Sequence, residues 1–469
     1  MKKELFFKTE SLWKTLEDEK LDTVQDFGES YKSFIDKSKT ERKCIKEIIE
    51  EAKADGFISF EQYQGNGEKN GGKNLQGGEK LYFINKEKAV ILVVVGEEPM
   101  ESGVNIIGTH VDSPRLDLKP FPFYEDSELA LAKTHYYGGV KKYQWVTMPL
   151  AMHGVITKEN GELVEITIGE DPSDPILMIS DLLPHLSKDQ MDKKMSEGIT
   201  GEGLNVLLGN RRIKEGEEKE GVKAYLLQLL NQKYGLREED FAFAEIQLVP
   251  AGGARDVGLD RSMIAAYGQD DRVCAYAELQ AILNLNTPKK TAMAVFVDKE
   301  EVGSISNTGM ESKFFENTLD ELLFLQEGTT RLSIRRALNQ SRALSGDVMS
   351  AFDPNFPEVL DPKNSCYLGK GVNISKYTGS RGKGGCNDAN HEFLAELRQT
   401  FKNHEIQWQM GELGKVDQGG GGTIAYIIGN YNTEVVDCGV PMLSMHAPME
   451  IISKVDLYMT YLAYRAFYL

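Results

Sequence analysis

The sequence lacks any hydrophobic run long enough to cross a membrane. Its longest apolar stretch, Ala89 to Val95, is far shorter than the roughly 20 residues of a transmembrane helix and is typical of a buried strand. The amino terminus, MKKELFFKTESLW, has a basic pair but neither the apolar core nor the small-residue cleavage site of a secretory signal. We therefore expect a cytoplasmic protein with no membrane partner.

Positive charge is scarce relative to negative charge. The chain has 54 Lys and Arg residues against 72 Asp and Glu residues, which gives a formal net charge of −18. Nucleic acids and anionic lipid surfaces both need a basic face on their partner, so neither is expected to bind. A local basic pocket inside an acidic surface can still accept an acidic substrate.

Cysteine is rare and shows no pairing pattern. The number is odd and no CxxC occurs, which indicates free thiols in a reducing compartment rather than a disulfide framework. The cysteines are Cys44, Cys274, Cys366, Cys386 and Cys438.

A chain of 469 residues is too long for one ordinary core and suggests two domains. Residues 120–250 differ from the rest, because stretches such as WVTMPLAMHGVITKENGELVEITIG alternate like antiparallel strands. We predict an α/β fold: a mixed-sheet domain between helices, formed by residues 1–119 and 251–469, is interrupted by a β-rich domain. One helix of that inserted domain is expected near Val222–Tyr234.

Local patterns predict further elements. Ser38 and Glu41 form a capping box for a helix over about 38–55, and the glycine-rich segment 65–78 reads as a loop. LYFI and AVILVVV predict a hairpin, and NIIGTHVD and AMAVFVD predict buried strands. The remaining predictions are a helix after Asp270, a helix capped by Asn387 that runs to about Lys402, and a last helix capped by Ser453 with Asp456.

Side chains that bind metals occur at the ends of several apolar runs. In an open α/β sheet the carboxyl ends of strands meet at one edge, where ligands bind. Imidazole and carboxylate without thiolate favour zinc, manganese or cobalt, and a set of this size can hold two ions. The candidates are His110, Asp270, Glu300, Glu301, Asp347 and His446.

Each candidate also has a simpler interpretation. Asp270 can be a helix N-cap, His446 an ordinary loop histidine, and the glutamates a solvated strand end. Asp112 lies two residues after His110, so its carboxylate can accept the second imidazole N–H; it can equally be a turn residue before Ser113-Pro114. The joint occurrence favours a metal site.

The paired glutamates are expected to have two different roles. One of Glu300 and Glu301 can bind metal while the other stays near a water whose pKa the metals lower, and acts as a general base. The segment GGGG at 419–422 lacks the Lys-Ser/Thr of a P-loop and the order GxGxxG, so we interpret it as a close-packed wall near a ligand or as a tight turn.

With these segments in place, the chain resembles the aspartyl aminopeptidase family, which includes vacuolar aminopeptidase I. THVDSP is similar to the family's H-T-D-S-P, GQDDR to L-D-N-R and VDKEEVGS to D-H-E-E-V-G-S. SGDVMSAFDPNFPE is similar to S-A-D-M-A-H-A-x-x-P-N-Y, GGGGTI to G-S-T-I and SMHAP to S-M-H-S-P. The motifs occur in the family's order over most of the chain.

The resemblance implies a role for each matching residue. The implied ligands of two zinc ions per subunit are His110, Asp270, Glu301, Asp347 and His446, with Asp270 bridging both ions. Glu300 is implied as the general base and Asp112 as the companion of His110. Lys370 and Tyr377 match substrate-facing residues of the element K-x-N-x-x-Q-R-Y, and His185 is implied to reach a neighbouring subunit's site.

The resemblance further implies an aminopeptidase that acts on short peptides, and an inserted dimerisation domain that joins subunits into a tetrahedral dodecamer. Two departures concern the side-chain pocket: the family's His after S-A-D-M-A is Ser350, and Q-R-Y is Ser375-Lys376-Tyr377. A preference for Asp or Glu and a preference for a neutral residue such as Leu therefore both stay open. The alternatives are a dinuclear deacylase and a non-catalytic, shell-forming binding protein.

Overall fold

A computed structural model describes residues 5–69, 75–214, 219–327, 332–385 and 387–469. The chain divides into two units. The larger comprises Met1–Asp112, Ala254–Met445 and Glu450–Leu469, and the smaller comprises Ser113–Gly253 and His446–Met449. None of the helices in the described ranges is long and apolar enough to span a bilayer.

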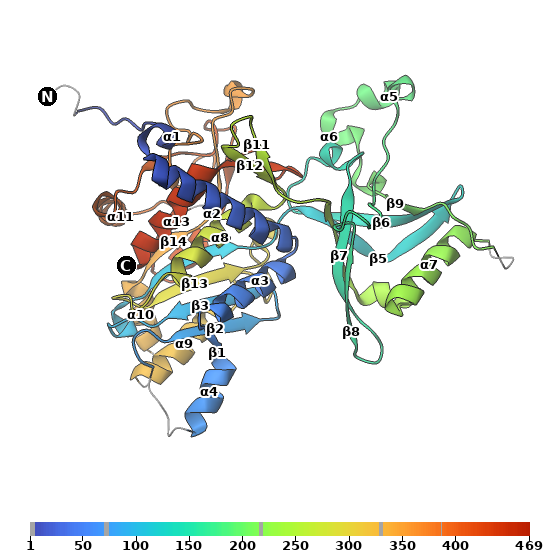
Figure 1. The fold of residues 1–469 in the computed structure, drawn as a ribbon. Helices are drawn as coiled ribbons and strands as arrows, with labels where there is room; N and C mark the ends of the chain where they lie inside the picture. The colour runs from blue at the N-terminus through green and yellow to red at the C-terminus, as the bar shows by residue number, and fades with distance from the viewer. Residues whose placement is uncertain (1–4, 70–74, 215–218, 328–331, 386) are drawn as a thin grey trace. The chain divides into compact units, whose positions relative to one another are not determined.

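The larger unit is built on a nine-stranded mixed sheet (Figure 1). Strands β13, β4, β14 and β20 are parallel neighbours, whereas β3 and β16 run antiparallel to this central group. The carboxyl ends of the four parallel strands therefore share one edge. In spatial order the strands are β1 (Ile58–Ser59), β2 (Lys80–Asn85), β3 (Ala89–Val94), β13 (Ala292–Val297), β4 (Asn105–His110), β14 (Arg342–Ser345), β20 (Glu434–Gly439), β16 (Val372–Ser375) and β18 (Trp408–Met410).

Helices cover both faces of this sheet, as the sequence predicts (Figure 1). One core contains residues of α2 (Asp18–Lys37), α3 (Glu41–Ala54), α8 (Gln269–Leu283), α11 (His391–Asn403) and α13 (Lys454–Tyr468). The opposite core contains residues of α4 (Phe60–Lys69), α9 (Phe314–Glu327), α10 (Ser333–Gln340) and α12 (Ala425–Gly429).

Strand β13 shows why a continuous apolar run folds this way. Ala292, Ala294 and Phe296 contribute to one core, and Met293, Val295 and Val297 contribute to the other. Because successive side chains of a strand point to opposite faces, only a strand covered by helices on both sides is apolar throughout.

Two smaller sheets complete the larger unit. One has the order β11 (Arg255–Val257), β12 (Met263–Ala266), β22 (Glu450–Ser453), β21 (Pro441–Leu443) and β15 (Met349–Ser350). The other pairs β17 (Gly379–Ser380) with β19 (Gly420–Gly421).

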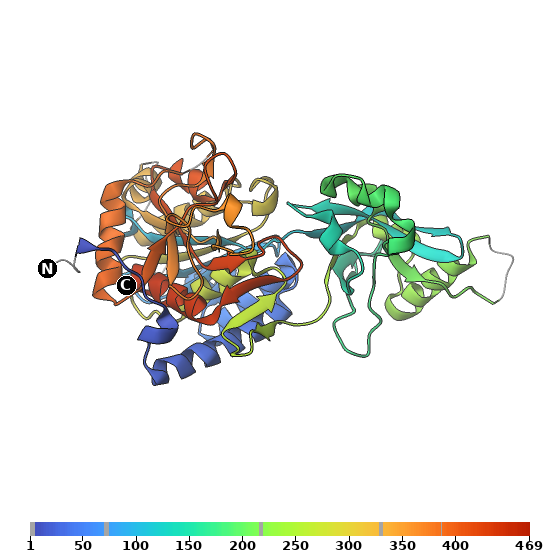
Figure 2. The same ribbon diagram turned by 90° about the horizontal axis from the view of Figure 1, so that it is seen from above.

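The smaller unit is a six-stranded sheet whose neighbours are all antiparallel. Its order is β8 (Leu163–Ile168), β7 (Leu150–Thr157), β10 (Glu245–Pro250), β5 (Arg115–Asp126), β6 (Leu129–Tyr137) and β9 (Val206–Gly209). Helix α7 (Gly221–Tyr234), where a helix was predicted, contacts β5, β6 and β9 (Figure 2). The short helices are α5 (Lys188–Met191) and α6 (Met195–Gly198).

Several helix ends differ from the predictions. Helix α2 extends to Lys37, so Ser38 ends that helix, and Thr40 caps α3 by accepting the Lys43 N–H. Helix α4 continues through residues 65–69 of the predicted loop, while residues 70–74 lie outside the described ranges. A segment rich in glycine is helical there because the packing of Phe60 and Tyr63 in the core outweighs propensity.

Two other predicted residues make no capping hydrogen bond. The N-cap of α11 is Asn390, and the Asn387 side chain donates to the Val435 carbonyl instead. Ser453 is the N-cap of α13, but its side chain makes no capping hydrogen bond. Among the described cysteines, Cys44, Cys274, Cys366 and Cys438 are buried free thiols, and Cys386 lies outside the described residues.

Asp456 connects its helix to a distant loop. Its buried carboxylate accepts the backbone N–H groups of Gly369 at 2.6 Å and Gly371 at 2.7 Å, just before β16. Both glycines have positive φ, +79° and +95°, a conformation that other residues rarely adopt. Burial raises the pKa of Asp456 to about 7, although the backbone hydrogen bonds act in the opposite direction.

We predict a characteristic pH dependence for the variant Asp456→Asn. The unfolded chain ionises this carboxyl near a pKa of about 3.9, so the folded state holds the proton more tightly. That contribution to stability is complete below about pH 4 and is lost as the pH rises through about 7. The free energy of unfolding of the wild type relative to Asp456→Asn should therefore fall by up to ~1.4 kcal/mol per pH unit in this window.

Urea unfolding of both proteins at several pH values measures this difference. Asp171→Asn, a change of an exposed turn carboxylate, serves as the control and should show no such decline. Parallel stability curves for the wild type and Asp456→Asn would contradict the prediction.

Candidate functional site

Three of the predicted ligands come from parallel strands that end at the same edge of the large sheet. His110 is the last residue of β4 and pairs in register with Val297, the last residue of β13. Asp347 lies two residues after the end of β14, whose Ser345 pairs with Gly108. The glutamate pair follows β13 in a short 3-10 turn, Glu300–Val302. The sheet therefore brings together residues far apart in the sequence.

Asp270 reaches the same place from the start of α8. Its backbone is not helical (φ −80°, ψ 107°), and Gly268 occupies the N-cap position. Asp270 thus lies in a kinked segment that leads into the regular part of α8. The Asp270 N–H donates to Glu450 Oε2 at 3.0 Å, which orients the backbone so that the carboxylate faces His110.

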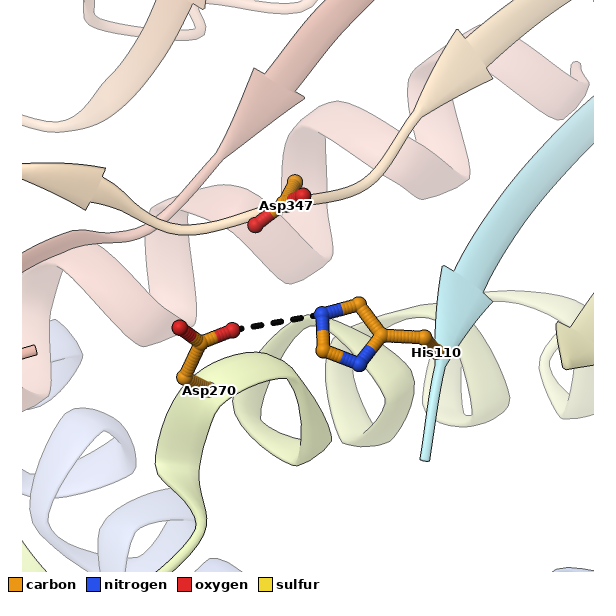
Figure 3. A group of neighbouring side chains, drawn as sticks. All are labelled: His110, Asp270 and Asp347. Atoms are coloured by element: carbon orange, nitrogen blue, oxygen red, sulfur yellow. Dashed lines mark ion pairs between the residues drawn. The ribbon is translucent and has the colours of Figure 1, made fainter. Parts of the chain in front are cut away.

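His110, Asp270 and Asp347 form a compact cluster (Figure 3). One potential ligand atom from each lies within 4.8 Å of the others. His110 Nε2 is 3.2 Å from Asp270 Oδ1, and these two side chains are 2% and 4% exposed. This arrangement can hold a metal ion through one imidazole and two carboxylates.

The paired glutamates lie beside this cluster. A Glu301 carboxylate oxygen is within the same 4.8 Å of Asp270, so Asp270 belongs to two groups of potential ligands. Glu300 Oε2 is farther from His110 Nε2, at 3.9 Å, and its side chain is 15% exposed. Glu301 thus lies beside Asp270, and Glu300 lies near His110.

Asp112 organises the turn that carries both glutamates. Its carboxylate accepts the Glu300 N–H at 3.1 Å and the Glu301 N–H at 3.2 Å. His110 Nδ1 lies 3.1 Å from the Asp112 carbonyl oxygen and 3.4 Å from Asp112 Oδ1. The Asp112 carbonyl and carboxylate oxygens thus both lie beside the imidazole Nδ1, the carbonyl being nearer, and the carboxylate also binds the turn.

The electrostatics of the cluster are dominated by crowded acidic groups. Burial alone would lower the pKa of His110, but hydrogen bonds to Asp112 and Asp270 and the charge of Glu300 raise it well above its usual value. Burial raises the pKa of Asp347 far above its ordinary range, and the charges of Asp271, Asp270 and Glu300 add to this. These shifts show an excess of negative charge in a buried space.

A divalent cation fits this environment. It would offset the crowded carboxylates, and the nitrogen and oxygen donors are those that zinc accepts. The described residues of the cluster therefore match the chemistry of a metal site.

His446 belongs to the short segment 446–449 that groups with the smaller unit. Its Nδ1 lies 3.0 Å from the Gly139 carbonyl oxygen, which favours the tautomer with the lone pair on Nε2. Its backbone has a positive φ of 64°. This orientation is the one that a metal-binding histidine adopts.

The other predicted residues contact different groups. The Lys370 ammonium lies 4.7 Å from the centre of the Tyr367 ring, and the Lys383 ammonium lies 4.2 Å from that of Tyr377. A hydrogen bond with Glu412 raises the pKa of Tyr377. His185 is exposed in a 3-10 turn of the smaller unit.

Close backbone packing explains glycine in the segment 419–422. Gly420 and Gly421 pair with Ser380 and Gly379, and a Cβ at Gly420 would lie 2.4 Å from the Gly379 carbonyl oxygen. Close contact between two backbones therefore requires glycine there. Thr423, the next non-glycine residue, donates to the buried Asp437 carboxylate at 2.6 Å.

The sequence did not reveal two supporting carboxylates. Glu450, which orients Asp270, follows His446 by only four positions in the segment SMHAPME, so its proximity to a predicted ligand was the available signal. Asp298 lies two residues before Glu300 and accepts the Thr308 hydroxyl at 2.8 Å. Burial raises the pKa of Asp298 to about 6.

Comparison with known proteins agrees with this arrangement. Residues 34–468 match the family model described as aminopeptidase I zinc metalloprotease (M18). A probable M18 family aminopeptidase 1 of Clostridium acetobutylicum is 51% identical over 467 residues, which cover 100% of this chain and 99% of the relative.

Solved structures show the same fold. The crystal structure of an M18 family aminopeptidase from Thermotoga maritima is 43% identical, with a TM-score of 0.93 over 98% of this chain and 99% of that one. The mApe1 dodecamer of S. cerevisiae is 19% identical, with a TM-score of 0.73 over 95% and 96% of the two chains, and shares the fold. The chain therefore belongs to the M18 family of zinc metalloproteases and is an aminopeptidase.

Proposed function

We propose that this aminopeptidase uses two zinc ions per subunit to remove single amino-terminal residues from short peptides. The proposed ligands are His110, Asp270, Glu301, Asp347 and His446. The observation that supports this most strongly is the position of Asp270, whose carboxylate belongs both to the group with His110 and Asp347 and to a group with Glu301. A carboxylate so placed suits a bridge between two ions.

Zinc, or manganese or cobalt in its place, would act as a Lewis acid that lowers the pKa of water and polarises the peptide carbonyl. Glu300 is our proposed general base, which takes a proton from the attacking water and passes it to the leaving amine. Its 3.9 Å separation from His110 Nε2 and its partial exposure, 15% of the side chain, suit a carboxylate that stays outside the ligand set. Asp112 holds the turn through the Glu300 and Glu301 N–H groups, so base and ligand keep a constant spacing.

The amino-terminal side chain preferred by the enzyme is either acidic or neutral. Lys370, held just before β16 by the hydrogen bonds from Gly369 and Gly371 to Asp456, supports an acidic residue through its charge. Ser350 and Ser375, which replace larger polar residues of the resembling family, support a neutral residue such as Leu. We propose that Lys370 and Tyr377 contact the substrate in either case.

We also propose that the protein is a homo-oligomer, with the smaller unit as its dimerisation domain and dimers joined into a tetrahedral dodecamer. Support comes from the dodecamer of the yeast protein with this fold. Large apolar side chains are also exposed around His185, which we propose reaches a neighbouring subunit's site. They are Leu182, Leu183, Leu186, Met191 and Met195. The buried free thiols agree with a cytoplasmic location.

The first test is the hydrolysis of aminoacyl p-nitroanilides of Asp, Glu, Leu and Lys by metal-stripped protein before and after addition of zinc or cobalt. We expect metal-dependent release from one class of residue, acidic or neutral, because the pocket can complement only one of them. Hydrolysis of acyl-amino acids in place of free-amine substrates would indicate a deacylase. No release by folded, metal-loaded protein would indicate a binding protein.

Glu300→Gln should lower kcat by about a hundredfold to ten-thousandfold, since the amide cannot accept a proton. Metal content, measured by elemental analysis, should stay at the wild-type value because Glu300 is not a proposed ligand. Glu316→Gln, a change of a surface glutamate paired with Lys313, is the matched control and should leave both quantities unchanged. A fully active Glu300→Gln protein would rule out this residue as the base.

Asp112→Ala should weaken zinc binding by about tenfold to a hundredfold, because the turn that carries Glu301 loses both of its carboxylate hydrogen bonds. Competition with a chelating dye measures this affinity. Asp361→Asn, in an exposed turn where the carboxylate also accepts a backbone N–H, provides the comparison. Equal zinc affinities for Asp112→Ala and the wild type would show that the turn keeps its shape without the carboxylate.

A further inference from the structure

Glu278 is a buried carboxyl group for which the proposed mechanism has no use. It lies in α8, and its side chain is fully enclosed. Glu278 Oε2 is 2.6 Å from the Thr109 hydroxyl oxygen, and Glu278 Oε1 accepts the Val295 N–H at 2.9 Å. One side chain of α8 is therefore hydrogen-bonded to both β4 and β13.

The chemistry of the surroundings suits a neutral carboxyl group. No ion pair joins Glu278 to a Lys, Arg or His in the described ranges of the chain. Burial raises the pKa of Glu278 well above its ordinary range; the hydrogen bonds from Thr109 and Val295 oppose this, and the charge of Asp271 adds to it. The Glu278 carboxyl accepts both hydrogen bonds, one from the Thr109 hydroxyl and one from the Val295 N–H.

These contacts are made next to the proposed metal ligands. Thr109 directly precedes His110 in β4, and Val295 lies in β13, which leads to the glutamate turn. Helix α8 begins with the segment that contains Asp270. The Glu278 carboxyl thus links the three elements that carry His110, Glu301 and Asp270.

A second contact joins the start of α8 to β4. Asp271, in the non-helical turn with which this segment begins, accepts the His110 N–H through Oδ2 at 3.4 Å. The Asp271 and Glu278 side chains are both fully buried. The segment therefore contacts β4 through polar groups at two places, Asp271 and Glu278, and hydrogen bonds constrain direction as well as distance.

We propose that Glu278 is a positioning residue that holds α8 against β4 and β13, and thereby sets the distance of Asp270 from His110 and the affinity of the site for zinc. This inference depends on the metal site proposed above. Glu278 itself does not touch metal or substrate.

Isosteric variants separate this role from general packing. Thr109→Val removes the hydroxyl with little change of volume, and Thr109→Ser keeps it. Glu278→Gln keeps a donor and an acceptor, whereas Glu278→Leu removes both. Thr460→Val is the matched control: Thr460 is a buried threonine of α13 whose hydroxyl bonds only within its own helix.

The measurements are zinc affinity of the full-length protein by dye competition, thermal unfolding of the metal-free protein, and kcat and KM. Thr109→Val and Glu278→Leu should each weaken zinc binding by about tenfold to a hundredfold and lower kcat more than they raise KM. Thr109→Ser, Glu278→Gln and Thr460→Val should retain the wild-type zinc affinity.

Wild-type zinc affinity and kcat in Thr109→Val would overturn the inference while leaving the proposed function intact. So would a loss in Glu278→Gln equal to that in Glu278→Leu, because the hydrogen bonds would then not be the cause. If Glu278→Leu does not fold, Thr109→Val and Glu278→Gln still test the inference. A wild-type protein that binds no zinc would instead contradict the proposed function itself.

Discussion

The structure depends on one electrostatic constraint: several carboxylates are held together in a buried space beside the imidazole of His110. Burial and mutual repulsion raise the pKa of Asp347, and nearby carboxylates raise that of His110. Without a cation such a group of acids disfavours the folded state, because charge is costly to bury unless it is paired. A divalent metal ion bound there would pair with the carboxylates and offset this cost, which explains why a zinc metalloprotease tolerates so many acids in one place.

The rest of the larger unit supports that group. Parallel strands bring His110 and Asp347 to one edge of the sheet, and Asp112 holds the turn with the paired glutamates. Glu450 orients Asp270 from a separate small sheet, and Glu278 joins α8 to β4 and β13. Each of these three supporting carboxyls accepts a backbone N–H, so the site is attached mainly to main chain.

Some features of the structure follow from local sequence patterns, whereas others depend on residues that are remote in the sequence. The strand β13 was predictable because a short, continuous apolar run is typical of a strand buried on both faces, and the helix α7 lies where it was predicted. Caps were less predictable: Ser38 and Thr40 are both reasonable caps, and only the end of the preceding helix decides between them. Asp456 looks like a capping residue, yet it bonds to Gly369 and Gly371, which are remote in sequence.

Sequence alone determined the residue types of the site, their order and the apolar runs that they follow, since those depend on chemistry and on short-range periodicity. It also indicated the family, through motifs that are continuous in the chain. Tertiary structure alone decided that Asp270 lies beside both His110 and Glu301, and that Asp112 accepts the two N–H groups of the glutamate turn. It also decided that Glu278 links two strands. These relations join segments far apart in the chain, and only the packing of α8 on a sheet with parallel strands determines their distances.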